Sequence, residues 1–198
     1  MQGDDQLRYF AADANADRLQ TAIFWDAPVT RPCMLHVWGF SGGWPFGELE
    51  IIDDPDSPRR RPTDVMVFLS TVLFLSDRAK SALEQAIDAR TVEWLPVRYR
   101  NERWWIMHGL VLLDALDEQR SEVRRGERSG GVVAVGRLRV IAEKCKGHAL
   151  FRLSRGFETW VYIVSSDFVD AWNKAGLKGF DFIPLDDAPD GSPVNTGH

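Results

Sequence analysis

The stretch Val72-Leu73-Phe74-Leu75-Ser76-Asp77-Arg78-Ala79 decides the fold of this chain. Its first four residues are apolar and favour a short strand, and Ser76 is a residue type that caps helices. Apolar residues then recur at the spacing of one helix face, at Ala79, Ala82, Leu83, Ala86 and Ile87. An alternating run at 92–97 follows and includes a proline that suits a strand end. Together these features predict a strand-helix-strand unit.

The same pattern returns near the C-terminus. Residues 160–164 predict a strand, Ser165 or Ser166 can cap, helix-spaced apolar residues follow, and residues 180–185 predict a second strand. The helix positions of the two segments correspond at a constant offset of 89 residues, as Ser76 and Ser165 do. We therefore predict two similar strand-helix-strand units.

The rest of the chain adds short strands between turns. They are expected at residues 7–11, 21–25, 34–38, 48–52, 103–108, 132–143 and 148–153. The predicted fold class is α+β, with a mixed or antiparallel sheet and two or three helices, which would cover one face of that sheet. We expect one domain over residues 1–185, with an acidic N-terminal segment at 1–62, and a flexible tail at 186–198.

Charge and hydropathy exclude several classes of function. Residues 1–58 hold ten acidic and three basic side chains, and such a segment repels nucleic acid and attracts basic partners. The longest apolar run, at 65–75, is far shorter than the roughly 20 residues that span a bilayer. The N-terminus lacks the basic and apolar regions of a secretory signal, so the expected location is the cytoplasm. The two cysteines, Cys33 and Cys145, are expected to be reduced thiols.

No motif makes a convincing active site. Gly39-Phe40-Ser41-Gly42-Gly43 matches the nucleophile elbow of hydrolases, but a Trp-Pro pair follows where that motif needs a helix, and Asp114 and His148 would have to complete the triad. Cys145 and His148 form a single Cys-x-x-His pair without the second pair that a zinc site needs, and the sequence contains no phosphate-binding loop, so we expect no metal and no cofactor. A small hydrolase using Ser41 and a small-ligand sensor remain alternatives to a protein that binds another protein.

Aromatic residues interleaved with carboxylates are typical of protein interfaces. On this basis we predict a partner-binding surface in the acidic segment, extended by two acids of the charged stretch at 114–125, and we expect a monomer or weak homodimer. The predicted residues are Trp38, Phe40, Trp44, Phe46, Asp53, Asp54, Asp56, Asp117 and Glu118. Asp117 could alternatively cap a turn or pair with Arg120.

Several short motifs resemble one bacterial family. They lie at residues 113–122, 75–79, 95–97, 147–153, 164–168 and 175–182. This order of motifs is similar to that of a family first catalogued as a domain of unknown function and later assigned to the immunity proteins of polymorphic toxin systems, the eleventh of that series. The resemblance covers residues 64–185, does not extend to residues 1–62, and departs from the family's asparagine at His108.

The resemblance implies a cytoplasmic antidote that binds and blocks a cognate toxin delivered between bacteria. It carries over no catalytic residue. A basic toxin would suit the acidic N-terminal segment.

Overall fold

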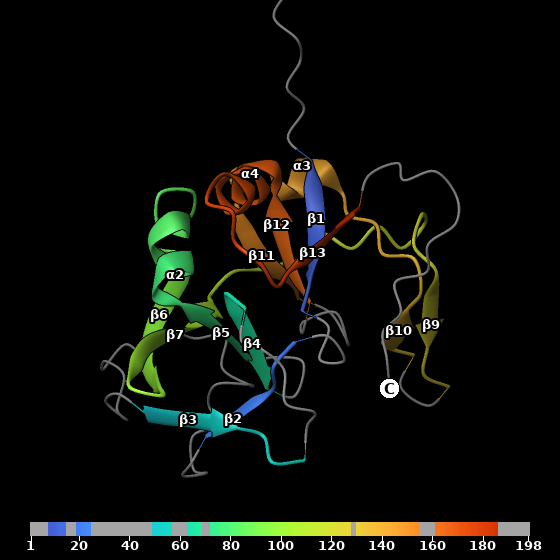
Figure 1. The fold of residues 1–198 in the computed structure, drawn as a ribbon. Coiled ribbons are helices and arrows are strands. Elements are labelled where there is room, and N and C mark those ends of the chain that lie inside the picture. The colour runs from blue at the N-terminus through green and yellow to red at the C-terminus, as the bar shows by residue number, and fades with distance from the viewer. Residues whose placement is uncertain are drawn as a thin grey trace, which may run out of the picture.

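The computed structural model describes residues 8–14, 19–24, 49–56, 63–68, 72–127, 130–154 and 161–185. These residues form mostly β-structure with three helices, arranged as two mixed sheets and a two-stranded ribbon (Figure 1). The predicted α+β class is therefore confirmed. The predicted strand at 34–38 lies outside the described residues, and so does the predicted tail at 186–198.

The larger sheet has six strands in the order β2-β3-β6-β7-β5-β4. These are β2 (Ala22–Phe24), β3 (Leu49–Asp53), β6 (Val92–Tyr99), β7 (Glu102–Gly109), β5 (Val72–Ser76) and β4 (Val65–Phe68). Only β3 and β6 run parallel to each other. Strands β6 and β7 form a hairpin paired at eight positions, and its two turn residues, Arg100 and Asn101, have φ of 49° and 68°. Two positive φ angles define a type I′ turn, whose backbone twist matches the twist of the flanking strands.

The smaller sheet has five strands in the order β13-β1-β12-β11-β8. These are β13 (Asp181–Pro184), β1 (Tyr9–Asp13), β12 (Tyr162–Ser165), β11 (Leu150–Leu153) and β8 (Leu112–Leu113). The ribbon consists of β9 (Val123–Arg125) and β10 (Val132–Val135), and the short helix α3 (Ala142–Cys145) follows it.

Helices α2 (Asp77–Leu83) and α4 (Ser166–Lys174) contact each other (Figure 1). The predicted cap of α2 is confirmed, because the Ser76 Oγ atom accepts a hydrogen bond from the Ala79 N–H at 3.2 Å. The helix ends at Leu83, four residues before the predicted Ile87, which is nevertheless buried. Ser165 occupies the N-cap position of α4, but its hydroxyl makes no capping hydrogen bond, so the capping prediction is wrong in that detail.

Both predicted strand-helix-strand segments have the expected order of elements. In each, the two strands lie on either side of a third strand and antiparallel to it: β5 and β6 flank β7, and β12 and β13 flank β1. The two segments belong to different sheets, whereas the sequence suggested one sheet covered by two helices. Whether the two units are similar beyond this order stays a prediction.

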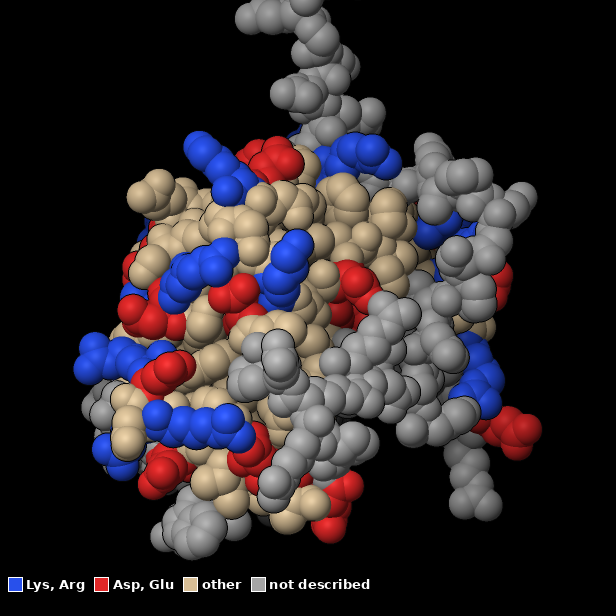
Figure 2. All heavy atoms as spheres, in the orientation of Figure 1, with Lys and Arg blue, Asp and Glu red and all other residues tan. Residues whose placement is uncertain are grey.

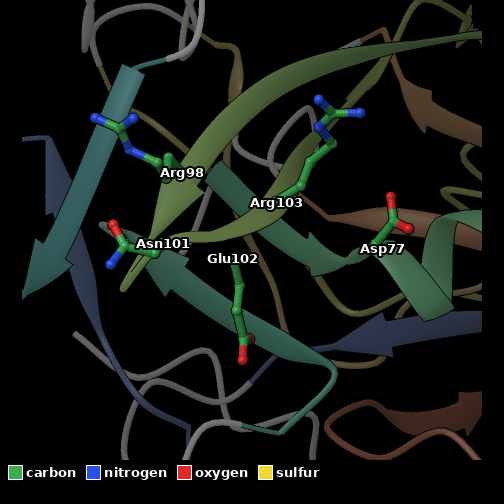
Figure 3. Close-up of a pocket in the computed structure, with 5 residues that line it drawn as sticks. All are labelled: Asp77, Arg98, Asn101, Glu102 and Arg103. Atoms are coloured by element: carbon green, nitrogen blue, oxygen red, sulfur yellow. The ribbon is translucent and has the colours of Figure 1, made fainter.

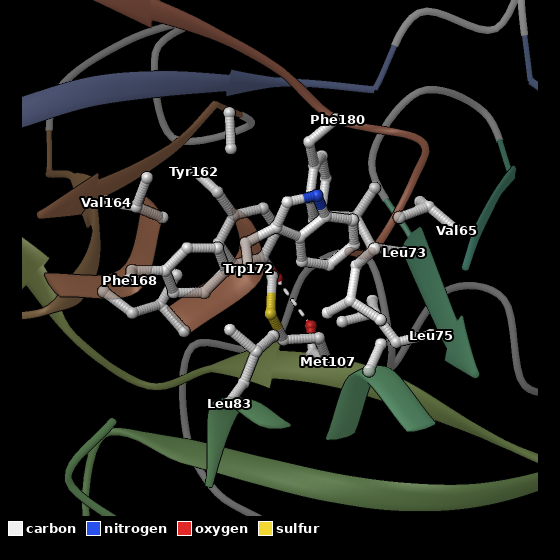
Figure 4. Close-up of a cluster of buried hydrophobic side chains, with 14 of the residues drawn as sticks. Val65, Leu73, Leu75, Leu83, Met107, Tyr162, Val164, Phe168, Trp172 and Phe180 are labelled. Carbon is white, nitrogen blue, oxygen red and sulfur yellow. Dashed lines mark hydrogen bonds between the residues drawn. The ribbon is translucent and has the colours of Figure 1, made fainter. Parts of the chain in front are cut away.

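A central core of buried side chains joins both sheets and both helices (Figure 4). It includes Leu75 and Met107 from the larger sheet, Tyr162 from the smaller sheet, and Phe168 and Trp172 from α4. The Tyr162 hydroxyl donates to the Met107 carbonyl at 3.0 Å, which ties the two sheets together.

A second tie between the sheets comes from Arg152, a buried arginine on β11. Its Nη2 atom donates to the Gly109 carbonyl at 2.8 Å, and its guanidinium lies 5.5 Å from the centre of the Tyr162 ring. Two further cores lie on the outer faces of the sheets, one around Phe74 and Trp104 and the other around Phe151.

The prediction of one strand over residues 132–143 is wrong. Strand β10 ends at Val135, and the chain continues as an irregular ribbon partner in which the Gly136 N–H donates to the Glu122 carbonyl at 2.8 Å. Leu138 and Val140 are nevertheless buried. The last two residues of the range belong to helix α3. Among the described residues, no helix is long and apolar enough to cross a membrane.

Candidate functional site

The end of the β6–β7 hairpin carries an open, polar hollow of about 420 Å³ (Figure 3). It is lined by Asp77, Arg98, Asn101, Glu102 and Arg103. Asp77 is the first residue of α2 and the other four lie at the end of the hairpin, so the hollow lies between the hairpin tip and the start of the helix. It is lined by charged side chains, unlike the closed apolar pocket that a small-ligand sensor would need.

Two arginines occupy opposite positions on the two strands of the hairpin. Arg98 and Arg103 are cross-strand partners, so their side chains lie on the same face of the sheet. Figure 3 shows both side chains projecting to one side and Glu102 to the other. Arg98 forms an ion pair with Glu50, with 3.8 Å between Nη2 and Oε2, which is longer than a hydrogen bond.

Trp105 lies next to this arginine pair on the same face of the hairpin. Its indole N–H donates to the Asp77 carboxylate at 2.8 Å, and the Lys80 ammonium lies 4.6 Å from the centre of its ring. The Arg103 guanidinium lies 5.8 Å from that ring. We call Trp105, Lys80 and the five residues that line the hollow the tip surface. The Trp105 ring of this surface is held in one orientation by its hydrogen bond to Asp77 and by the nearby cations of Lys80 and Arg103.

The acidic turn that follows β3 adjoins the tip surface. Asp53 accepts hydrogen bonds from the Tyr99 hydroxyl and the Arg100 guanidinium, both at 2.6 Å. This predicted partner-binding residue therefore stabilises the fold by joining β3 to the hairpin. Burial, together with the hydrogen bond to Asp53, raises the pKa of Tyr99 to about 12. Among the described residues, the carboxylates of Asp54 and Asp56 form no ion pair, and that of Asp54 accepts only the Asp56 N–H.

The Tyr99→Phe variant is expected to lose about 1–3 kcal/mol of unfolding free energy at neutral pH, because a buried hydrogen bond to a charged acceptor is removed. Since the folded-state pKa of Tyr99 lies above the ordinary value of 10, this contribution is complete below pH 10 and is lost as the pH rises through about 12. Denaturant unfolding of both proteins at several pH values measures the difference. A difference that stays constant up to pH 12 would contradict the predicted role of Asp53.

Asp117 and Glu118, two further predicted binding residues, lie on another part of the molecule. Figure 1 shows the β9–β10 ribbon on the opposite side from β3. The Asp117 carboxylate accepts the backbone N–H groups of Gln119 and Arg120 at 3.2 and 3.1 Å, which is the capping role that the sequence offered as its alternative. Glu118 pairs with Arg125. The structure therefore does not bring these two acids together with Asp53, Asp54 and Asp56.

The four aromatic residues of the predicted binding surface lie outside the described residues. They are Trp38, Phe40, Trp44 and Phe46. Ser41, the nucleophile of the alternative hydrolase, lies outside them too.

The other members of that proposed triad are not assembled. Asp114 pairs with Lys144 at 4.0 Å, and the buried His148 Nδ1 atom has no hydrogen-bond partner among the described residues. Burial raises the pKa of the Cys145 thiol to about 12, which leaves it protonated and unreactive. Among the residues that the structure describes, no group of three or more His, Cys, Asp or Glu side chains could hold a metal ion.

The sequence reasoning missed the tip surface. Tyr99-Arg100-Asn101-Glu102 stands between two runs predicted as strands, and an asparagine there could have indicated a two-residue hairpin turn. That turn would have placed Arg98 opposite Arg103. The face in Figure 2 carries basic and acidic side chains interleaved over the region of α2 and the hairpin, rather than one acidic patch.

Comparison with known proteins supports one family. No protein of curated function matches the chain. The model of the family described as "Immunity protein family (Imm11)" matches residues 21–187. This range includes most of the N-terminal segment, which the sequence motifs alone had left outside the resemblance. Because the match spans most of its length, the chain belongs to the Imm11 family of immunity proteins.

Proposed function

We propose that this immunity protein neutralises a cognate bacterial toxin in the cytoplasm by binding it directly, and that the tip surface takes part in the contact. Membership of the Imm11 family supports the kind of function. The single structural observation that carries the choice of surface is Trp105, a half-exposed tryptophan fixed by Asp77 and Lys80.

A fixed tryptophan is suited to anchor an interface. Tryptophan and arginine are enriched among the few residues that supply most of the binding energy of protein complexes. A side chain that is already held in one orientation loses little conformational entropy when a partner covers it. Trp105 has both properties, and Arg98 and Arg103 stand beside it on the same face.

The acidic turn next to the tip surface supplies a second kind of contact. Asp54 is half-buried and Asp56 is exposed, so both carboxylates can reach basic side chains of a partner. We propose that they bind basic residues of the toxin at the rim of the interface, where charges chiefly raise the association rate. Asp53 takes part indirectly by holding the turn against Arg100.

The Trp105→Ala variant is expected to bind the toxin at least ten-fold more weakly, as loss of an anchoring tryptophan does. The full-length protein and the toxin encoded in the adjacent reading frame are used, and calorimetry or surface plasmon resonance measures Kd. Asp54→Lys combined with Asp56→Lys is expected to slow association several-fold, more so at low salt.

Lys174→Ala serves as the control for these variants, because this exposed side chain lies on α4, away from the hairpin. Its Kd should equal that of the wild type. If the wild-type protein fails to bind the toxin, the proposed function is wrong. If it binds and Trp105→Ala leaves Kd unchanged, the toxin contacts a different surface.

A further inference from the structure

Three half-exposed apolar residues lie next to one another on the α2 side of the β6–β7 hairpin. Pro96 is the cross-strand partner of Trp105, and Trp94 is the partner of Met107, so all four side chains point to the same face of the sheet. Met107 is buried in the central core together with Leu83 of α2 (Figure 4). Trp94, Pro96 and Trp105 remain partly exposed, and we call these three residues the apolar strip.

The placement of the neighbouring elements leaves the strip accessible. Helix α2 contacts β5 and β7, whereas Trp94 and Pro96 stand on β6. On the outer side of β6, strand β3 pairs only with Val97 and Arg98. Among the described residues, Trp94 and Pro96 therefore have a neighbouring strand on one side only. Exposed apolar surface made of adjoining side chains is typical of sites that bind another protein.

Trp94 carries an unused hydrogen-bond donor. Among the described residues, its side chain makes no hydrogen bond and no contact with another aromatic ring. Its indole nitrogen is not one of the buried side-chain atoms that lack a partner, so solvent reaches it. Trp105 differs in this respect, because its indole N–H donates to Asp77 at 2.8 Å. The strip thus offers one N–H donor beside apolar surface.

The charges next to the strip do not select a partner of either sign. The hollow is lined by two acids, Asp77 and Glu102, as well as by two arginines, and Arg98 already pairs with Glu50. The apolar strip and its N–H donor are therefore the features of this face that can distinguish one partner from another.

An extended segment fits these features better than a helix does. The carbonyl groups of an α-helix accept hydrogen bonds within the helix, except in its last turn, whereas those of an isolated extended segment are available to another donor. Extended segments also pack apolar side chains, proline among them, against aromatic rings in several modes of peptide recognition.

From this geometry we infer that the apolar strip receives an extended, apolar segment of the toxin, and that a main-chain carbonyl of this segment accepts a hydrogen bond from the Trp94 indole N–H. This inference rests on the proposed function and specifies the kind of segment that binds beside Trp105. It assigns a binding role to Trp94 and Pro96, which lie outside the tip surface.

The Trp94→Phe variant removes the N–H donor but keeps an aromatic ring. It is expected to bind the toxin of the adjacent reading frame about three-fold more weakly or worse, the effect of one lost hydrogen bond. Pro96→Thr suits a β-strand but removes apolar surface, and a loss of about three-fold is expected here too. Trp104→Phe is the matched control, because it makes the same change on the opposite, buried face of the hairpin and should leave Kd unchanged. Calorimetry measures Kd after thermal unfolding has established that each variant is folded.

The Trp94 N–H can also be observed directly by NMR. In the ¹⁵N-labelled full-length protein each tryptophan gives one indole N–H signal, and the signal missing from Trp94→Phe is that of Trp94. When the toxin is added, this signal is expected to move downfield and its proton to exchange more slowly with water, as protons in hydrogen bonds do. One of a set of overlapping synthetic peptides of the toxin, added in large excess, is expected to move the same signal.

Each outcome decides a different point. Failure of the wild-type protein to bind the toxin would overturn both the proposed function and this inference. Wild-type binding with an unchanged Kd in Trp94→Phe and Pro96→Thr would overturn the inference alone. So would a Trp94 signal that the toxin does not move. A signal that is moved by the folded toxin but by none of its peptides would show that the strip receives a folded surface and not an extended segment.

Discussion

The Trp172→Ala variant is expected to lose about 3–5 kcal/mol of unfolding free energy, the range typical of truncating a large buried aromatic residue. Trp172 is only 2% exposed and lies in the central core. The centre of its ring lies 4.8 Å from that of Phe180 and 6.4 Å from that of Phe168, against which it stacks. Truncation would remove these contacts and leave a cavity where α4, the chain after it and both sheets meet.

Chemical denaturation of the wild type and the variant measures this loss. Trp105→Ala is the matched control, because it removes the same side chain from the half-exposed tip surface and is expected to cost about 1 kcal/mol. The two tryptophans thus separate stability from binding: Trp172→Ala impairs folding, whereas Trp105→Ala impairs binding to the toxin. An equal loss of stability in both variants would contradict this division of roles.

Individual helices and strands could be predicted from the sequence, because apolar periodicity and helix capping depend only on residues that are close together in the chain. The Ser76 cap follows from its residue type, and the buried positions Ala79 and Leu83 follow from the spacing of apolar residues. The placement of β1 between β12 and β13 could not be predicted in this way. Those strands are separated from β1 by most of the chain, and several strands with similar alternation compete for the same neighbours.

The candidate site was predicted only in part, and for a related reason. Composition identified Asp53, Asp54 and Asp56 as a dense group of acids. It could not show that Asp53 accepts hydrogen bonds from Tyr99 and Arg100. Composition also overlooked Arg98 and Arg103, because a pair of arginines on facing strands leaves no local excess of charge in the sequence. Only the register of the hairpin places them together.

The Gly179→Ala variant is expected to be destabilised by about 3–5 kcal/mol, for two independent reasons. Gly179 has φ of +132°, a conformation that residues with a side chain rarely adopt, at a strain of about 1–3 kcal/mol. A Cβ atom at this position would also lie 2.7 Å from the Thr63 Oγ1 atom and 2.9 Å from the Val65 Cβ atom. Relieving such overlap adds about 1–3 kcal/mol.

The position of Gly179 makes this overlap hard to avoid. The neighbouring Lys178 is held by Asp64, whose N–H donates to the Lys178 carbonyl and whose carboxylate accepts the Lys178 N–H, both at 2.9 Å. The same carboxylate accepts the Ser76 hydroxyl, so the segment is fixed against β4 and the start of α2. Gly130→Ala is the control, because Gly130 has φ of +64° but, among the described residues, no atom lies within 4 Å of the place that an added Cβ atom would take. Its expected loss is about 1 kcal/mol from strain alone, and equal losses in the two variants would show that the close contact of Gly179 contributes nothing.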